Sequence, residues 1–457
     1  MRDIPTGPRA IIGLRFLRAM QNDPVSFLTR VARAYGDIVQ FRIGGHVLVL
    51  LNHPDLIHEM VVARHRSFRK NHVLQRVKAV LGEGLFTSDG DLHRVQRRLS
   101  QPAFHRERIA AYAEVMVARA TAMRGAWQDG ATIDIHREMT KVTLSVVAKT
   151  LFDADLQAEA DEIGGAITDL IDLFPRVMNP VALAMLRLPI PARFRLRAAM
   201  RRLDRTIYTI IENRRASGDD RGDLLSMLLF AHDEEGGGMT DMQLRDETLT
   251  LLLAGHETTA SALAWTWYLL ALHPAVAHEV HRVVDQVLGD RPATASDYPH
   301  LRYLEMVVAE AMRLYPPAWI VSGDAVEEVN LGGWRVPPQA LVLASQAVTH
   351  RDPRWWDEPD TFDPLRFTAE ASASRPKFAY FPFSSGPRVC IAEGFAWMES
   401  VLMLATFAQH WSMEAVSRNV KTQASLTLRP RGGIRVRLSK RVRTHMDAPL
   451  HAAGAPS

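Results

Sequence analysis

The 457-residue chain contains very little cysteine, with Cys390 as its single thiol. One thiol excludes an internal disulfide and a zinc site built from several cysteines. Long apolar runs are also missing near the N-terminus, where charged residues interrupt the first twenty positions at Arg2, Asp3, Arg9, Arg15 and Arg18. No apolar stretch within these twenty residues reaches the length of a signal peptide or a membrane span. We therefore expect a cytoplasmic protein without a transmembrane anchor.

A large excess of charge of one sign is absent as well. The 55 basic and 51 acidic residues give a net charge of +4, which is too balanced to indicate a nucleic-acid partner. A hydrophobic content of 47% over this length allows a large buried core. No internal repeat or linker divides the chain, so we expect one domain at 1–439. Residues 440–457, rich in Arg, Ala, Gly and Pro, are predicted to form a disordered tail.

Helical periodicity dominates the chain, and strand-like segments are few. The expected helices are near residues 24–36, 105–127, 138–152, 192–217 and 395–410. Two hairpins are expected, at 38–52 with a turn at Gly44-Gly45 and at 326–348 with a turn at Gly332-Gly333. A third glycine-rich stretch, 236–238, is expected to be a loop before a helix capped at Thr240 or Asp241. The prediction is a mainly α fold, with a large helical lobe beside a small β-rich lobe.

The only cysteine ends the segment Phe383-Ser384-Ser385-Gly386-Pro387-Arg388-Val389-Cys390. A thiolate that ligates haem iron needs a tight turn, nearby donors and a positive neighbour. Gly386, Pro387 and Arg388 provide these features. The following residues, 391–399, predict a helix start whose dipole favours a thiolate. The alternative is a buried structural cysteine.

The pattern Phe-x-x-Gly-x-Arg-x-Cys resembles the haem-binding loop of the cytochrome P450 family. This resemblance implies haem b (iron protoporphyrin IX), with Cys390 as the axial ligand of the iron and with Phe383, Gly386 and Arg388 in the haem-binding loop. Two positions differ from the usual pattern. Glycine often stands where this chain has Ser384, and again where it has Ala392.

A helix on the order of 40 Å long is expected from about Asp246 to Leu272. Its middle, Ala254-Gly255-His256-Glu257-Thr258-Thr259, combines a glycine that lets a ligand approach with hydroxyls that can bond back to carbonyls. The sequence resembles the central helix motif of the same family. That implies that Ala254 lies over the haem, and that Glu257 and Thr258 deliver protons for cleavage of the O–O bond of dioxygen. The alternative is a buried helix with incidental threonines.

A metalloprotease site is excluded at this position. The HExxH pattern would begin at His256, but Ala260 stands where the second histidine is required.

Glu310 and Arg313 form an ExxR pair before Pro316-Pro317. The same spacing occurs at Glu212 with Arg215, where a solvated helix pair is the simpler interpretation. Context sets Glu310 apart, since it resembles the ExxR helix of the family. The resemblance implies a buried structural network, with Arg366 as its third member.

His93 and Arg97 are four residues apart and project from one helix face. A solvated basic stripe is the simple alternative, and the outward Arg94 and Arg98 suit an acidic redox partner. The resemblance implies that His93 and Arg97 bind haem propionates. A further propionate-binding arginine, often present in the family, is missing at Gly323-Asp324.

Four motifs in family order cover nearly the whole chain. They imply a haem-thiolate monooxygenase that inserts one atom of O2 into a lipophilic terpenoid, fatty acid, polyketide or steroid. Electrons are expected from a ferredoxin or flavodoxin with an NAD(P)H reductase, and the protein is expected to be a monomer. A peroxygenase that uses H2O2 and a non-catalytic haem protein are the alternatives. Pocket walls, or plain core, are expected at 68–86, 167–194, 318–321 and 426–433.

Overall fold

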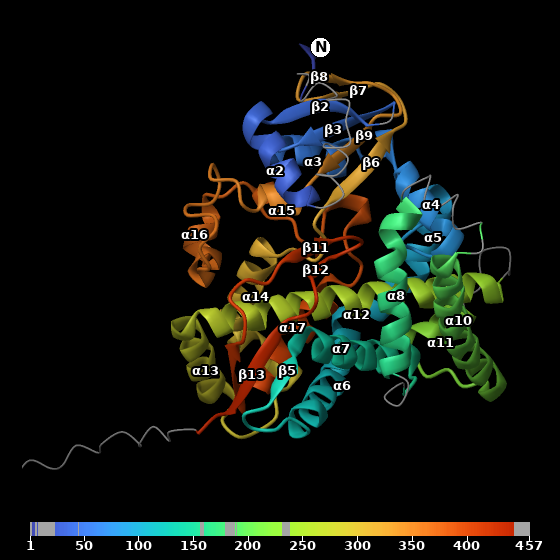
Figure 1. Cartoon of the computed structure of the whole chain (residues 1–457). Coiled ribbons are helices and arrows are strands. Elements are labelled where there is room, and N and C mark those ends of the chain that lie inside the picture. The colour runs from blue at the N-terminus through green and yellow to red at the C-terminus, as the bar shows by residue number, and fades with distance from the viewer. Residues whose placement is uncertain are drawn as a thin grey trace, which may run out of the picture.

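The computed structural model describes residues 2–4, 7, 23–43, 45–155, 160–178, 188, 190–230 and 238–442. It has a large helical lobe and a smaller lobe that contains most of the sheet (Figure 1). In the described residues, no helix is long and apolar enough to cross a membrane. Most of the tail predicted at 440–457, together with Gly44, lies outside the described residues.

Helices dominate the described chain, as predicted. They are α2 (Pro24–Tyr35), α3 (Pro54–His58), α4 (His72–Leu81), α5 (Gly90–Ser100), α6 (Arg106–Gly125), α7 (Ile135–Phe152), α8 (Ala160–Met178), α10 (Pro191–Ser217), α11 (Leu224–Phe230), α12 (Asp241–Leu272), α13 (Pro274–Leu288), α14 (Arg302–Leu314), α15 (Gln346–Thr349), α16 (Ala369–Ala373) and α17 (Glu393–Ala408). The five helices expected from periodicity are confirmed, with ends within three residues of the predicted ones.

The largest sheet has five strands, in the order β2-β3-β9-β6-β4. Its strands are β2 (Ile38–Ile43), β3 (His46–Leu51), β9 (Leu341–Ala344), β6 (Val321–Ala325) and β4 (Phe68–Arg69). β2 and β3 form the predicted antiparallel hairpin, whereas β3 and β9 are parallel and far apart in sequence. This sheet therefore brings strands β2, β3 and β4 from the N-terminal part of the chain together with β6 and β9 from its last third.

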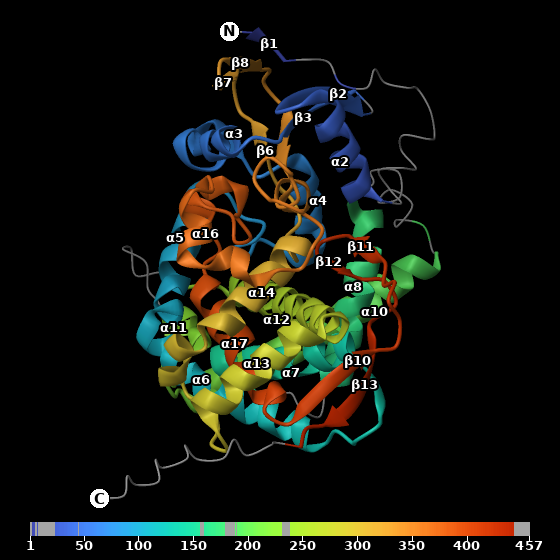
Figure 2. The ribbon, with the colours of Figure 1, turned by 90° about the vertical axis from the view of Figure 1, so that its left-hand side faces the viewer.

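Smaller sheets complete the fold. Their strands are β1 (Arg2–Asp3), β7 (Val329–Leu331), β8 (Trp334–Val336), β5 (Thr132–Asp134), β10 (Trp411–Ala415), β13 (Arg435–Lys440), β11 (Thr422–Ala424) and β12 (Leu428–Pro430). β7 and β8 are the second predicted hairpin, and positive φ angles at Gly332 and Gly333 form its turn. The hairpin of β11 and β12 lies between the β lobe and the helices (Figure 2).

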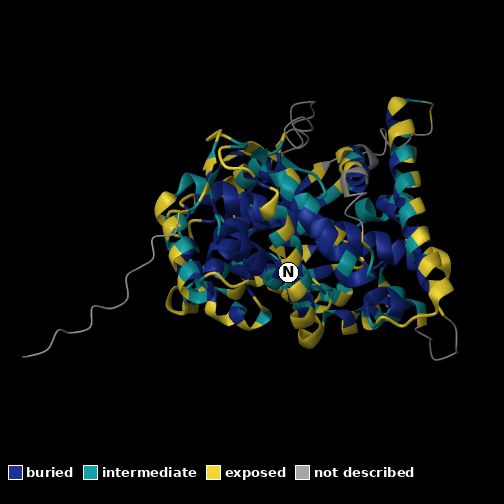
Figure 3. Ribbon diagram, turned by 90° about the horizontal axis from the view of Figure 1, so that it is seen from below, coloured by how far each residue is buried: buried dark blue, intermediate teal, exposed yellow. Residues whose placement is uncertain are grey.

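Helix α12 runs through the helical lobe, and nearly all of its residues are buried. Its first residue is Asp241, and its N-cap is Thr240, one of the two predicted caps, which forms a capping box with Gln243. The helix therefore starts five residues before the expected Asp246. Seen from below, buried residues fill the middle of this lobe and exposed residues lie on its outer turns (Figure 3).

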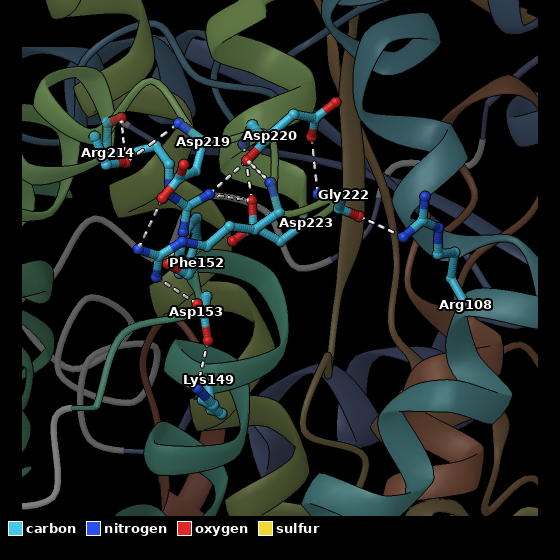
Figure 4. Close-up of polar contacts among 12 residues, drawn as sticks. Arg108, Lys149, Phe152, Asp153, Arg214, Asp219, Asp220, Gly222 and Asp223 are labelled. Atoms are coloured by element: carbon cyan, nitrogen blue, oxygen red, sulfur yellow. Dashed lines mark hydrogen bonds and ion pairs between the residues drawn. The ribbon is translucent and has the colours of Figure 1, made fainter.

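A buried arginine joins α10 to its neighbours. Arg214 donates to Asp223 Oδ1 at 2.6 Å, to Ser226 Oγ at 2.5 Å and to the Phe152 carbonyl at 3.1 Å. These contacts connect the C-terminal end of α10 with α11 and with the end of α7 (Figure 4). Burial without Asp223 would leave the Arg214 charge uncompensated, so these contacts fix the end of α10 against α11 and α7.

Candidate active site

The loop before Cys390 is closed by its own backbone. The Cys390 N–H donates to the Phe383 carbonyl at 3.0 Å, and the Ser384 N–H donates to the Phe381 carbonyl at 3.0 Å. Gly386 has φ +70°, and a Cβ on it would lie 2.3 Å from the Val61 carbonyl oxygen. Only glycine satisfies both conditions. Phe383 packs against Trp397 of α17, with ring centroids 5.6 Å apart.

The two departures from the family pattern differ in their physical consequence. Ser384 has φ +62°, a left-handed conformation that glycine adopts at less cost. Ala392 is the N-cap of α17 with φ −99°, which any residue adopts. The serine therefore carries local strain, and the alanine does not.

The environment of the Cys390 thiol does not hold it as a thiolate by itself. Burial raises its pKa to about 11, although the Ala392 N–H and the charge of Arg97 act in the opposite direction. Arg388, the cation expected beside the sulfur, instead donates to the Phe68 carbonyl at 3.1 Å and to Asp89 Oδ1 at 2.7 Å. Deprotonation is then the consequence of metal coordination, which removes a thiol proton outright.

Four basic side chains gather near this loop. Burial lowers the pKa of His93 to about 4, and the charges of Lys70, Arg388 and Arg97 lower it further. Arg97 donates to the Val389 carbonyl at 2.7 Å. The acidic residue Asp89 lies in the same cluster, and its charge raises the pKa of His93. This arrangement favours an anionic group, because each cation raises the cost of charging the next.

Lys70 is the basic residue that the sequence analysis missed. Its Nζ donates to the Leu85 and Phe86 carbonyls at 2.7 and 2.9 Å, and burial followed by the Arg388 charge lowers its pKa to about 7. The one sequence signal is its place directly after β4, which is too weak to distinguish it from other lysines. Where the expected arginine is missing, Asp324 accepts from the backbone N–H of His72 at 2.6 Å.

The middle of α12 presents Ala254 and Thr258 on one face. Ala254 is exposed although Leu251, Leu252 and Leu253 before it are buried. The Thr258 hydroxyl donates to the Ala254 carbonyl at 2.9 Å, as expected. Cys390 is likewise exposed in a loop deep enough for burial to dominate its pKa. Exposed surface at these interior positions, with four basic side chains near the cysteine loop, fits a flat anionic macrocycle with a thiolate ligand.

Gly255 was expected to let a ligand approach the helix, but it packs against α7 instead. A Cβ there would meet Val147 Cγ2 of α7 at 3.0 Å. The glycine therefore permits close packing of two helices.

Glu257 points in a different direction from Thr258, because consecutive helical residues project from different faces. It is 4% exposed, and its Oε1 accepts from the Thr427 hydroxyl at 3.0 Å. Burial raises the pKa of this carboxyl. The structure thus brings Ala254 and Thr258 together and places the acid against the β11–β12 turn.

An apolar cavity adjoins α12. It is lined by Val77, Val80, Leu81, Leu170, Ile171, Phe174, Leu253 and Leu426. The predicted segments 68–86, 167–194 and 426–433 all contribute to it, whereas residues 179–187 and 189 of the second segment lie outside the described residues. All eight side chains are apolar, and the space that they enclose is small, about 10 Å³, so they form an apolar wall beside α12.

The ExxR pair is fully buried on α14. Arg313 donates through Nε to Glu310 Oε2 at 2.6 Å and through Nη2 to Oε1 at 2.8 Å. The Asp363 N–H donates to Glu310 at 3.0 Å, and Arg366 Nε lies 3.5 Å from the same carboxylate. The structure therefore brings together the three residues predicted as a network.

A cysteine loop before a helix, basic groups beside it and a hydroxyl-bearing central helix define a haem-thiolate protein. The sequence profile described as cytochrome P450 matches residues 4–436. The chain belongs to the cytochrome P450 family, and it is a monooxygenase with a haem-thiolate cofactor.

Bacterial relatives and one solved structure are similar over nearly the full length. Cyclooctatin synthase of Streptomyces melanosporofaciens is 40% identical, covering 90% of this chain and 91% of that protein. Pentalenene oxygenase of Streptomyces avermitilis is 33% identical, covering 95% and 97%. The crystal structure of the cytochrome P450DA haem domain has a TM-score of 0.84 and 27% identity, covering 97% and 98%.

Proposed function

We propose that this protein inserts one atom of O2 into a terpenoid of low polarity. The apolar lining beside Leu253 is the observation that carries the proposal. The relatives named cyclooctatin synthase and pentalenene oxygenase support this substrate class over fatty acids, polyketides and steroids. Apolar side chains of this kind favour a hydrocarbon substrate, which gains affinity by leaving water.

The chain's own residues divide the work. Cys390 would ligate the haem iron, Phe383 and Gly386 shape the loop that carries it, and the small side chain of Ala254 would leave room for the haem. Lys70, His93, Arg97 and Arg388 would hold the propionates, with Lys70 in place of the arginine missing at Gly323-Asp324. The bound haem supplies the activation of O2.

Protons reach the reacting oxygen through the side chains of α12. The Thr258 hydroxyl donates to the Ala254 carbonyl, and rotation about its Cα–Cβ bond would free it from that carbonyl. Burial raises the pKa of Glu257, which favours its protonated form, and we assign this carboxyl as the proton donor. Glu310, Arg313 and Arg366 support the fold behind the cysteine loop.

Electrons come from a separate ferredoxin or flavodoxin with its NAD(P)H reductase, in the cytoplasm, and the enzyme acts as a monomer. Arg94 supports a docking face on α5, since its side chain is 77% exposed on the helix that also bears His93 and Arg97. An acidic partner would be attracted to such a face.

The test begins with the carbon monoxide difference spectrum of the reduced protein. A strongly red-shifted Soret band is expected from thiolate ligation. A library of cyclic terpenes and fatty acids is then screened for substrate-induced changes in the haem spectrum and for oxygenated product. Turnover of fatty acids with no response to terpenes would overturn the proposed substrate class, and turnover driven by H2O2 alone would favour the peroxygenase.

A further inference from the structure

The carboxyl of Glu257 lies among groups from three other elements. Thr427, in the turn before β12, donates its hydroxyl to Glu257 Oε1 at 3.0 Å. Arg429 of β12 lies close enough for its charge to act on Glu257. Arg429 does not pair with this carboxyl but donates through Nη2 to Oδ1 of Asp172 on α8. Only 7% of the Arg429 side chain is exposed, so losing its acidic partner would leave a buried charge unpaired.

The balance of charge around Glu257 depends on that choice. Burial raises the pKa of Glu257, Arg429 and the Thr427 hydrogen bond lower it, and Asp172 raises it. Two buried histidines, His136 of α7 and His256 of α12, lie near. Burial lowers the pKa of each to about 4, so both are neutral. The charges of Arg429 and His256 also lower the pKa of His136. Arg429 is therefore the basic group facing Glu257 among these residues.

An arginine left without Asp172 would take Glu257 as its partner. Guanidinium and carboxylate form strong charge-assisted hydrogen bonds when both are buried. A Glu257 held in this way would stay ionised and turned toward β12, and it would have no proton to give. Asp172 prevents this by accepting a hydrogen bond from the Arg429 guanidinium.

We propose that Asp172 and Arg429 are positioning residues for the reaction: Asp172 holds Arg429 away from Glu257 and thereby keeps Glu257 free to carry a proton toward Thr258. The proposal rests on the function assigned above to Glu257 and Thr258. Asp172 lies on α8 beside Ile171 and Phe174, which contribute to the apolar wall next to Leu253.

The experiment measures the protonation of Glu257 in the haem-loaded full chain. The carboxyl band of Glu257 is identified as the infrared signal lost in Glu257→Gln, and it is titrated with pH. We expect Asp172→Asn to move its midpoint down by about one pH unit or more, because Arg429 then pairs with Glu257. We expect Arg429→Met to move it up, because the stabilising cation is gone.

Asp169→Asn is the matched control. Asp169 lies one turn earlier on α8 and pairs at 2.5 Å with Arg195 of α10, so its loss leaves Arg429 engaged and the midpoint unchanged. The charge of Asp172 also acts on Arg195. Arg429→Lys keeps the charge and should keep the midpoint near the wild-type value, which covers the case in which Arg429→Met does not fold. Equal midpoints in Asp172→Asn and wild type, or shifts of the same sign in Asp172→Asn and Arg429→Met, would overturn the proposal.

Turnover separates this inference from the proposed function. With substrate and redox partner, Asp172→Asn should make less product per NAD(P)H at neutral pH and recover as the pH is lowered. If Glu257→Gln leaves that ratio unchanged, Glu257 is not on the proton path and the proposed function of this residue fails. The infrared midpoints still decide whether Asp172 and Arg429 control its protonation.

Discussion

Two buried glutamates, one behind the cysteine loop and one on the central helix, are treated by the fold in opposite ways. Glu310 on α14 meets Arg313 twice, the Asp363 N–H and the Arg366 guanidinium. Glu257 on α12 has one neutral hydroxyl partner, and the nearby Arg429 is bonded to Asp172. A fully paired charge supports a structure, whereas burial with one neutral partner favours the protonated form of a carboxyl. The difference predicts which substitutions damage the fold and which damage the chemistry.

The largest effect on stability is expected at Glu310. Glu310→Gln removes the charge that Arg313 and Arg366 share, and leaving a buried cation uncompensated costs about 3–5 kcal/mol. Urea unfolding of the haem-loaded protein measures the loss. Glu279→Gln is the control, because Glu279 pairs with Arg282 at the same spacing on an exposed surface and should change little. Equal losses in both variants would contradict the contrast between buried and exposed pairs.

The central helix should respond in activity and not in folding. Thr258→Ala removes one hydroxyl bonded to its own helix, so its unfolding should stay close to that of the wild type. Proton delivery should fail, and several-fold more NAD(P)H should be consumed per product. Thr259→Ala is the control, since that neighbouring hydroxyl bonds to the Gly255 carbonyl on a buried face. An unchanged product ratio in Thr258→Ala would remove Thr258 from the proton path.

Glu247, a third buried glutamate, lies in the N-terminal part of α12 and makes the stability depend on pH. Burial raises its pKa to about 7, and it accepts from the Leu85 N–H at 3.0 Å. The folded protein keeps this proton between pH 4.5 and about 7 while the unfolded chain releases it, so this group makes stability fall as pH rises through that window. Glu247→Gln removes the fall, worth roughly 3 kcal/mol at most. Unfolding at pH 5 and pH 8 tests it, and an unchanged difference between the two would contradict the assignment.

The basic cluster should hold haem less firmly without Lys70. Lys70→Met removes one cation facing the propionates, so haem should pass several-fold faster to an excess of a haem-binding acceptor. The difference from wild type should shrink above pH 7, because the pKa of Lys70 is about 7 in the protein without haem. Lys78→Met, which loses a surface pair with Glu83, is the control. Equal transfer rates at pH 6 in both variants would exclude Lys70 as a propionate ligand.

The smallest expected effect is a gain in the cysteine loop. Ser384→Gly relieves a left-handed residue at φ +62° and should stabilise the protein by about 1 kcal/mol. Ala392→Gly, at the family's other glycine position, should give no gain because its φ is −99°. Thermal unfolding of the two variants distinguishes them, and a gain in Ala392→Gly alone would reverse the interpretation.

Much of the site was predictable because its motifs are local. The spacing from Phe383 to Cys390 fixes a tight loop, and the hydroxyl of Thr258 finds a carbonyl one turn away. The partners of Arg388 were not predictable, because Asp89 lies 299 residues earlier in the chain. Glu257 shows the same limit. Its neighbours Thr427, Arg429 and Asp172 come from the β11–β12 turn, β12 and α8, and local sequence carries no signal for them.

The sequence by itself determined the family, the helical fold class and the order of the motifs, because each depends on residues within one turn or one helix. Tertiary structure alone decided that Asp324 accepts from the His72 N–H, that Lys70 joins the basic cluster, and that Arg429 is bonded to Asp172 instead of Glu257. The reason is physical. Burial and long-range charge set the protonation of these groups, and both depend on which distant segments the fold brings into contact.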